Sequence, residues 1–383
     1  MDLAFSLRTY DGRISRVSKR MAASRLDALI VSAPDNLHYL TGFDGLGYLW
    51  FQALLLGPGL AAPTLITRTT EEACVWQTSC VRHARFYDIA KADPVKLAAS
   101  VLAEAGAGDG RIGVELSAFT LLPQHWDRLR TLMPEAKFVD ASTLVAEERL
   151  IKSAEEIAYQ RVAAQMADHA LTRGLEALRP GIAEVEVAGV LARALGEAGS
   201  EHAAISPMVA SGPRSAMIHA MPGQRSLALG DVVCLELAGV CRRYHAVVMR
   251  TAVLGRASDR VREVAACLNE GFDAAIGAAR AGAAAGAPDR ACNARLERLD
   301  LVRRRAHRIG YSLGIAYAPT WLEAMLLDDA DSHRLAEGMS FTVEPNLSLA
   351  DEGFGIKLGD TVACTRAGGE SLSGLDRHLI VID

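Results

Sequence analysis

The stretch from Leu229 to Thr251, LGDVVCLELAGVCRRYHAVVMRT, predicts two β-strands joined by a turn. Glu236 interrupts the apolar run of the first strand. A carboxylate at such a position is costly to bury unless it is paired or takes part in binding or catalysis. Glu236 is therefore the first candidate for a functional residue, and a buried salt bridge is the alternative interpretation.

Length and composition bound the class of protein. The chain has 383 residues, of which 50% are hydrophobic and 23% charged, as in a globular protein of two or three domains. A net charge of −5 gives no basic surface for nucleic acid or an anionic membrane. No apolar run is long enough to cross a bilayer, and MDLAFSLRTYDGR lacks the features of a signal peptide. Seven scattered cysteines without a C-x-x-C pair favour reduced thiols. We expect a cytoplasmic enzyme.

Strands and helices alternate in the first part of the chain, which predicts an α/β domain over residues 1–149. No glycine-rich phosphate-binding motif follows any of these strands, so nucleotide binding is unsupported. The strand candidates are 28–31, 53–56, 64–67, 85–87, 112–116 and 137–139, and the helix candidates are 13–25, 94–105 and 122–132.

A boundary falls near 149–152, and residues 150–383 read as an α+β domain. Ser153 and Glu156 form an S-x-x-E capping box that opens a helix to about Leu178, where Pro180-Gly181 stops it. Further helices are predicted at 185–198, 258–279 and 288–302, and the last part of the chain, from 307 onward, is rich in strands.

Polar residues also stand in apolar or glycine-rich surroundings elsewhere in this second part. They are His219 in SAMIHAMP, His245 in the hairpin, His307 in AHRIGYSLG and Glu344 in MSFTVEPN. Each one alone is more simply a hydrogen-bonded structural residue. Their order along the chain, with Glu236, makes them a candidate site.

That order resembles the superfamily of creatinase, prolidase, aminopeptidase P and methionine aminopeptidase, which has the pita-bread fold. The resemblance covers nearly the whole chain. It implies an N-terminal α/β domain of the creatinase type followed by an α+β pita-bread catalytic domain. Its motifs are R-L-I-K-S-x-E-E-I at 149–157, the GDVV hairpin, His-x-x-Gly at 307–310, G-M-x-F-T-V-E-P at 338–345 and G-I-x-x-x-D-T at 355–361.

The metallopeptidases of this superfamily hold two divalent metals with two aspartates, a histidine and two glutamates. The matching positions here are Glu236, Val247, His307, Glu344 and Gly359. A further family histidine falls near Gly314. Because valine and glycine side chains offer no ligand to a hard cation, the resemblance implies no dinuclear site, and we expect neither metal nor cofactor.

The local sequence E-L-A-G-x-x-x-R-Y-H, together with H-R-x-G-Y-S-x-G, resembles the corresponding sequence of ectoine hydrolases, which open a cyclic amidine. The resemblance implies metal-independent hydrolysis of C–N bonds, with ectoine or 5-hydroxyectoine as the leading substrate. Unmetallated carboxylates would then attract the cationic amidine. The alternatives are a metal-dependent Xaa-Pro peptidase, a creatinase-like amidinohydrolase and a catalytically silent binding protein.

The expected catalytic residues are Glu236 as nucleophile or base, Glu344 as partner of the amidine nitrogen, and His219 and His307 for proton transfer. Four more residues of the second domain are candidates for substrate binding. They are Tyr244, His245 and Arg250 in the hairpin, where structural roles are the alternative, and Tyr311 in the pocket wall.

An aromatic segment from Asn36 to Trp50 lies in the first domain, and a loop packed by its own rings is one of two interpretations of it. In the superfamily, this part of the chain caps the active site of the partner subunit. The resemblance therefore implies a homodimer in which Phe43, Tyr48 and Trp50 wall a pocket at the interface.

Overall fold

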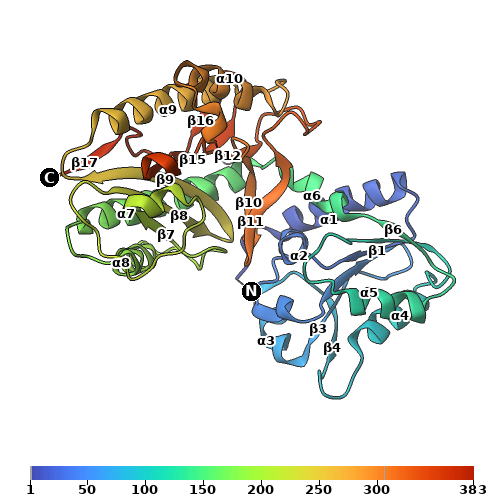
Figure 1. The fold of residues 1–383 in the computed structure, drawn as a ribbon. Coiled ribbons are helices and arrows are strands. Elements are labelled where there is room, and N and C mark those ends of the chain that lie inside the picture. The colour runs from blue at the N-terminus through green and yellow to red at the C-terminus, as the bar shows by residue number, and fades with distance from the viewer. Residues whose placement is uncertain (1, 306) are drawn as a thin grey trace. The chain divides into compact units, whose positions relative to one another are not determined.

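The computed structural model describes residues 2–305 and 307–383, and the chain divides into two compact units (Figure 1). The first unit ends at Arg149 and the second runs from Leu150 to Asp383. Among the described residues, no helix combines the length and the apolar character that spanning a bilayer requires.

The first unit is built on a mixed sheet with strand order β4-β3-β2-β1-β5-β6. Its strands are short and mostly apolar, and β1 and β2 are buried along their whole length, so one face packs on helices α4 and α5. The predicted α/β layer is confirmed. The strands are β1 (Ala28–Val31), β2 (Ala53–Leu56), β3 (Thr64–Arg68), β4 (His83–Tyr87), β5 (Arg111–Val114) and β6 (Lys137–Asp140).

The helices of this unit include segments that the sequence did not predict. Residues Pro34–Thr41 form helix α2, with proline in its first turn and Gly42 in the left-handed conformation at its end, so the first part of the aromatic segment is helical and not a loop. The other helices are α1 (Leu7–Ala23), α3 (Glu72–Thr78), α4 (Pro94–Glu104), α5 (Pro123–Leu132) and α6 (Ser142–Leu150).

The second unit contains a larger sheet, and its strand order β11-β10-β12-β15-β9-β8-β7 brings distant segments together. Strands β16 and β17 pair with β15 and β9, and β13 pairs with β14. The strands are β7 (Met208–Ser211), β8 (Val232–Cys241), β9 (Tyr244–Leu254), β10 (Tyr311–Tyr317), β11 (Thr320–Leu326), β12 (Ser340–Val343), β13 (Leu347–Leu349), β14 (Phe354–Ile356), β15 (Gly359–Cys364), β16 (Gly369–Ser371) and β17 (Ile380–Ile382).

Helices cover both faces of this sheet (Figure 1). Helix α7 (Ala154–Ala177) begins at the predicted capping box, in which the Ser153 hydroxyl accepts from the Glu156 N–H and the Glu156 carboxylate accepts from the Ser153 N–H. It packs closely on β8, since a Cβ at Gly239 would lie 2.0 Å from the carbonyl oxygen of Ala163. The other helices are α8 (Glu184–Glu197), α9 (Asp259–Ala278) and α10 (Ala287–Leu296).

The predicted hairpin is present as β8 and β9, and its register decides which side chains share a face. Arg242 and Arg243 form the turn with positive φ angles of 50° and 67°. Glu236 lies opposite Met249 on β9 and opposite Met208 on β7. Because opposite residues in an antiparallel pair project to the same side, the two methionines flank the carboxylate.

Candidate active site

The second unit contains a cavity of about 360 Å³ over the central strands of its sheet. Five of the sequence candidates line it together, although they are far apart in the chain. They are His219, Glu236, His307, Tyr311 and Glu344. The remaining wall is largely apolar and includes Met208, Met249 and Trp321. A cavity with an apolar wall and a few converging polar groups is typical of a small-molecule site.

The carboxyl group of Glu236 is paired with a lysine in this cavity. The Nζ atom of Lys357 donates to Glu236 Oε2 at 2.5 Å, and the side chains are 4% and 6% exposed. Lys357 lies between β14 and β15, 121 residues from its partner. The sequence prediction missed Lys357, although a lysine inside the apolar segment FGIKL could have suggested a buried partner.

Glu344 follows strand β12 and is buried in the same cavity. Burial, and then repulsion from Glu236, raise its pKa to about 8, against the opposing effects of Lys357, Tyr311 and Arg308. Its Oε2 has no hydrogen-bond partner in the part of the chain that the structure describes. At neutral pH Glu344 is therefore mainly a carboxylic acid, which can donate a proton.

The two histidines lie side by side. The rings of His219 and His307 are stacked 6.5 Å apart with an interplanar angle of 3°. His307 Nδ1 lies 2.7 Å from the carbonyl oxygen of Arg308 and 4.0 Å from Glu344 Oε1. Burial lowers the pKa of His307, so its ring is favoured in the neutral form.

Arg308 is a second cation at this site that the sequence prediction missed. It lines the cavity, and its guanidinium carbon lies 5.4 Å from the ring centroid of Tyr311. Its Nε is buried and has no hydrogen-bond partner among residues 2–305 and 307–383. Tyr311 is held in turn by Trp321, whose indole N–H donates to the tyrosine hydroxyl at 2.8 Å. Arg308 thus offers the cavity a positive charge.

The family's two-metal centre does not fit these residues. Val247 packs in an apolar cluster with Ala238, opposite it on β8. A Cβ at Gly359 would lie 3.0 Å from Met249 Sδ, so Met249 fills the space of a side chain there. No group of three or more His, Cys, Asp or Glu side chains within the described residues could hold a metal ion. The Lys357 ammonium contacts the carboxylate that a metal would need.

The other three hairpin candidates are not among the residues that line this cavity, and their role in substrate binding stays a prediction. The Tyr244 hydroxyl donates to Glu156 on α7 at 2.6 Å. His245 is fully buried, and its ring nitrogens contact the N–H of Ala204 and the carbonyl of Arg243. Arg250 pairs with buried Asp360 at 2.7 Å. These contacts fix the hairpin to its surroundings.

Phe43 and Trp50 belong to the first unit. Phe43 is 2% exposed, and its carbonyl contacts Nδ1 of His38 on α2. Trp50 is 37% exposed and stacks against Arg68, whose guanidinium carbon lies 3.4 Å from the ring centroid. Their predicted place at a subunit interface stays a prediction.

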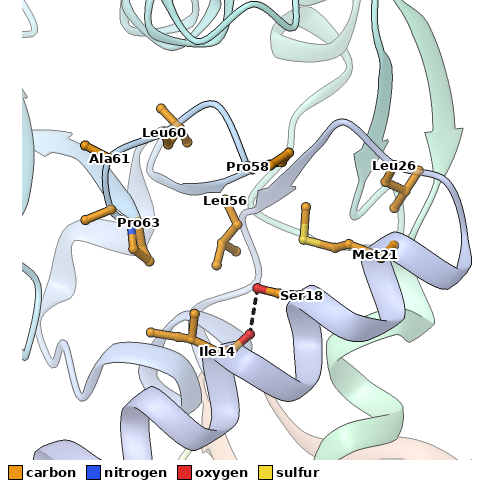
Figure 2. A pocket seen from close by; sticks show the side chains of 12 residues that line it. Ile14, Ser18, Met21, Leu26, Leu56, Pro58, Leu60, Ala61 and Pro63 are labelled. Carbon is orange, nitrogen blue, oxygen red and sulfur yellow. Dashed lines mark hydrogen bonds between the residues drawn. The ribbon is translucent and has the colours of Figure 1, made fainter.

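The first unit has a cavity of its own, of about 310 Å³, between α1 and the segment 56–63 (Figure 2). Its lining is almost entirely apolar and includes Ile14, Met21 and Leu60. The Ser18 hydroxyl donates to the Ile14 carbonyl at 2.9 Å, as the dashed line in Figure 2 shows. This cavity therefore has no converging polar groups for catalysis.

Comparison with known proteins shows which class of protein has this fold. The structure matches a crystal structure of prolidase from Thermococcus sibiricus with a TM-score of 0.89 and 25% identity, over 97% of this chain and 99% of that chain. The pita-bread fold is the fold of these prolidases.

Two family models cover most of the sequence. Residues 13–151 match the creatinase/prolidase N-terminal domain, and residues 158–366 match metallopeptidase family M24. The chain belongs to family M24. It is 29% identical over 398 residues to ectoine hydrolase of Halomonas elongata, and 30% identical over 394 residues to an uncharacterized hydrolase/peptidase of Sinorhizobium fredii. Both alignments cover 100% of this chain and 99% of the relative.

Proposed function

We propose that this protein is a metal-independent hydrolase that opens a small cyclic amidine carrying a carboxylate, with ectoine or 5-hydroxyectoine as the first substrates to test. The observation that carries the proposal is the pair of carboxyl groups in one cavity, of which Glu236 is paired with an ammonium and Glu344 is a proton donor. Two carboxyl groups in contrasting environments are a common arrangement for acid–base catalysis. The full-length likeness to ectoine hydrolase supports the same reading.

The charge distribution requires a correction to the expected mode of binding. Two bare carboxylates were expected to attract a cationic amidine. Instead, Lys357 offsets Glu236, and Glu344 is mainly neutral at pH 7. Arg308 adds a positive charge to the wall. A zwitterion fits this arrangement, since its carboxylate can pair with Arg308 while its amidinium carbon faces the two glutamates.

The reaction follows from these positions. Water adds its oxygen to the amidinium carbon while a proton passes to Glu236, which acts as the base. One C–N bond of the adduct then breaks as the departing nitrogen takes a proton from Glu344. The hydroxyl proton of the adduct returns to Glu344 as the amide carbonyl forms. The proton on Glu236 leaves with the amine as an ammonium, so both glutamates are restored.

The histidines and Tyr311 have supporting roles in this scheme. Neutral His307, 4.0 Å from Glu344 Oε1 and stacked on His219, can pass protons between the cavity and solvent. Tyr311 hydrogen-bonds Glu344 and, with Trp321, forms a rigid wall beside it. Closed packing of this kind holds the reacting groups in place.

The direct test is turnover of ectoine by purified protein in the presence of a chelator, with the open-chain N-acetyl diamino acid measured by NMR. Glu236→Gln should lower turnover by about 100-fold or more, because the amide cannot act as a base. Glu323→Gln is the matched control, since Glu323 is also buried against a lysine, Lys152, but does not line the cavity. Activity retained in Glu236→Gln would refute the mechanism.

A metal-dependent Xaa-Pro peptidase is the second candidate, because the pita-bread neighbours include prolidases. It predicts that chelator abolishes the activity and that divalent metal restores it toward Xaa-Pro dipeptides. Creatine turnover would favour an amidinohydrolase instead. Tight binding of ectoine without any turnover would favour a silent binding protein.

A further inference from the structure

The Lys357–Glu236 pair is the most enclosed charge pair that faces the cavity. Its nitrogen–oxygen distance is 2.5 Å, and both residues are at least 95% buried. No described residue hydrogen-bonds to Glu236 Oε1, whereas Oε2 receives the ammonium. One carboxylate oxygen is thus fixed and the other remains for substrate or water.

The backbone of Lys357 is fixed as well. Its N–H donates to the hydroxyl of Thr251 at 2.8 Å, and the same hydroxyl lies 2.8 Å from the Lys357 carbonyl oxygen. Thr251 is on β9, beside the strand that carries Glu236. The lysine therefore starts from a fixed point, and its ammonium loses little additional freedom on pairing.

We infer that Lys357 is a positioning residue whose ammonium holds Oε2 of Glu236, so that Oε1 is presented to the substrate. A charge-assisted hydrogen bond inside a buried pair fixes the orientation of the carboxylate. The assignment of Glu236 as the base rests on the proposed function, whereas the anchoring of Glu236 by Lys357 does not.

The second unit offers an internal comparison. Lys152 Nζ lies 2.5 Å from Glu323 Oε2, with side chains 1% and 3% exposed, but neither residue lines the cavity. Buried ion pairs are weak evidence for stability, since apolar residues of similar volume often replace them without loss. A pair whose carboxylate faces a cavity, and whose lysine is anchored by Thr251, points to a chemical role.

The test compares Lys357→Gln, Lys357→Arg and Lys152→Gln at neutral pH. A crystal structure of each variant reports the orientation of the Glu236 carboxylate. We expect the wild-type orientation in Lys357→Arg and a displaced carboxylate in Lys357→Gln. The kcat for ectoine should fall about 100-fold in Lys357→Gln with a smaller effect on KM, and it should recover in part in Lys357→Arg. Lys152→Gln should change neither the orientation of Glu236 nor kcat, although it lowers stability.

A Glu236 carboxylate that keeps its wild-type orientation in Lys357→Gln, or an unchanged kcat in that variant, would overturn the inference. If Lys357→Gln does not fold, the wild-type crystal structure still decides, because a Glu236 that makes no hydrogen bond to Lys357 contradicts it. The structural measurement needs no substrate. Failure of the proposed function, which is an absence of amidine turnover in every variant, is therefore distinguishable from failure of this inference.

Discussion

Glu344 is an acid that burial and a neighbouring carboxylate keep protonated at neutral pH, with its pKa raised to about 8. If it protonates the leaving nitrogen, kcat/KM should fall as pH rises through about 8, because the free enzyme then loses its proton donor. His307 does not account for such a limb, since burial lowers its pKa. Turnover measured from acid to alkaline pH would show the limb in the wild type.

The variant Glu344→Gln provides the corresponding check. Its amide cannot donate a proton as an acid, so kcat/KM should drop by about 100-fold or more and the alkaline limb should disappear. A limb that persists at the same pH in Glu344→Gln would assign the titration to another group.

Arg308 supports a separate prediction about substrate choice. Replacing it with methionine removes a charge-assisted hydrogen bond to the substrate carboxylate, worth about 1.5–3 kcal/mol, and should raise KM about 10-fold or more with a smaller effect on kcat. A cyclic amidine without a carboxylate should be unaffected by the change. Arg303→Met is the control, since Arg303 is exposed and pairs with Asp300. Equal losses for both amidines would contradict the assignment.

Among the elements, helix α2 shows how a distant residue can complete a helix end. Ala33, at its N-cap, has no side-chain hydrogen bond. Glu115, which follows β5, accepts instead from the N–H groups of Ser32 and Ala33 and from Asn36 Nδ2, at 2.7–2.8 Å. Burial raises the pKa of Glu115 to about 7. The start of α2 thus depends on a residue about 80 positions further along the chain.

Glu115→Ala should therefore loosen α2. It leaves buried donors without an acceptor, which costs about 1–3 kcal/mol of the free energy of unfolding of the first unit. Hydrogen exchange of the amides of residues 36–41 should accelerate, and thermal unfolding should shift downward. Glu104→Ala at the exposed end of α4 is the control, with an expected change within about 0.5 kcal/mol. Unchanged exchange in α2 would contradict this role.

At the scale of the whole molecule, the sequence predicted the structure correctly wherever local sequence patterns agreed with the order of motifs in the family. The capping box at Ser153, the hairpin around Glu236 and the alternation of strands and helices are local patterns, and the structure contains all of them. One cavity gathers His219, His307 and Glu344, which the order of motifs and the family resemblance had marked as a candidate site.

What the sequence left out are contacts between distant residues. Nothing near Lys357 indicates that Glu236, 121 residues away, is its partner. The start of α2 was missed for the same reason, since its acceptor is Glu115. The hairpin side chains of Tyr244 and Arg250 looked available for substrate because their partners, Glu156 and Asp360, lie on other elements. Polar side chains in strands are assigned reliably only when the facing elements are known.

The packing around Gly359 leaves no room for a metal ligand without rearrangement. The Cβ of any side chain there would lie 3.0 Å from Met249 Sδ and 3.2 Å from Glu344 Cβ, so Met249 would have to shift to admit it. The ammonium of Lys357, two residues earlier, also contacts the carboxylate of Glu236. Engineering metal dependence into this protein therefore requires several coordinated substitutions, because Gly359→Glu alone adds an acid without making space for it or freeing Glu236.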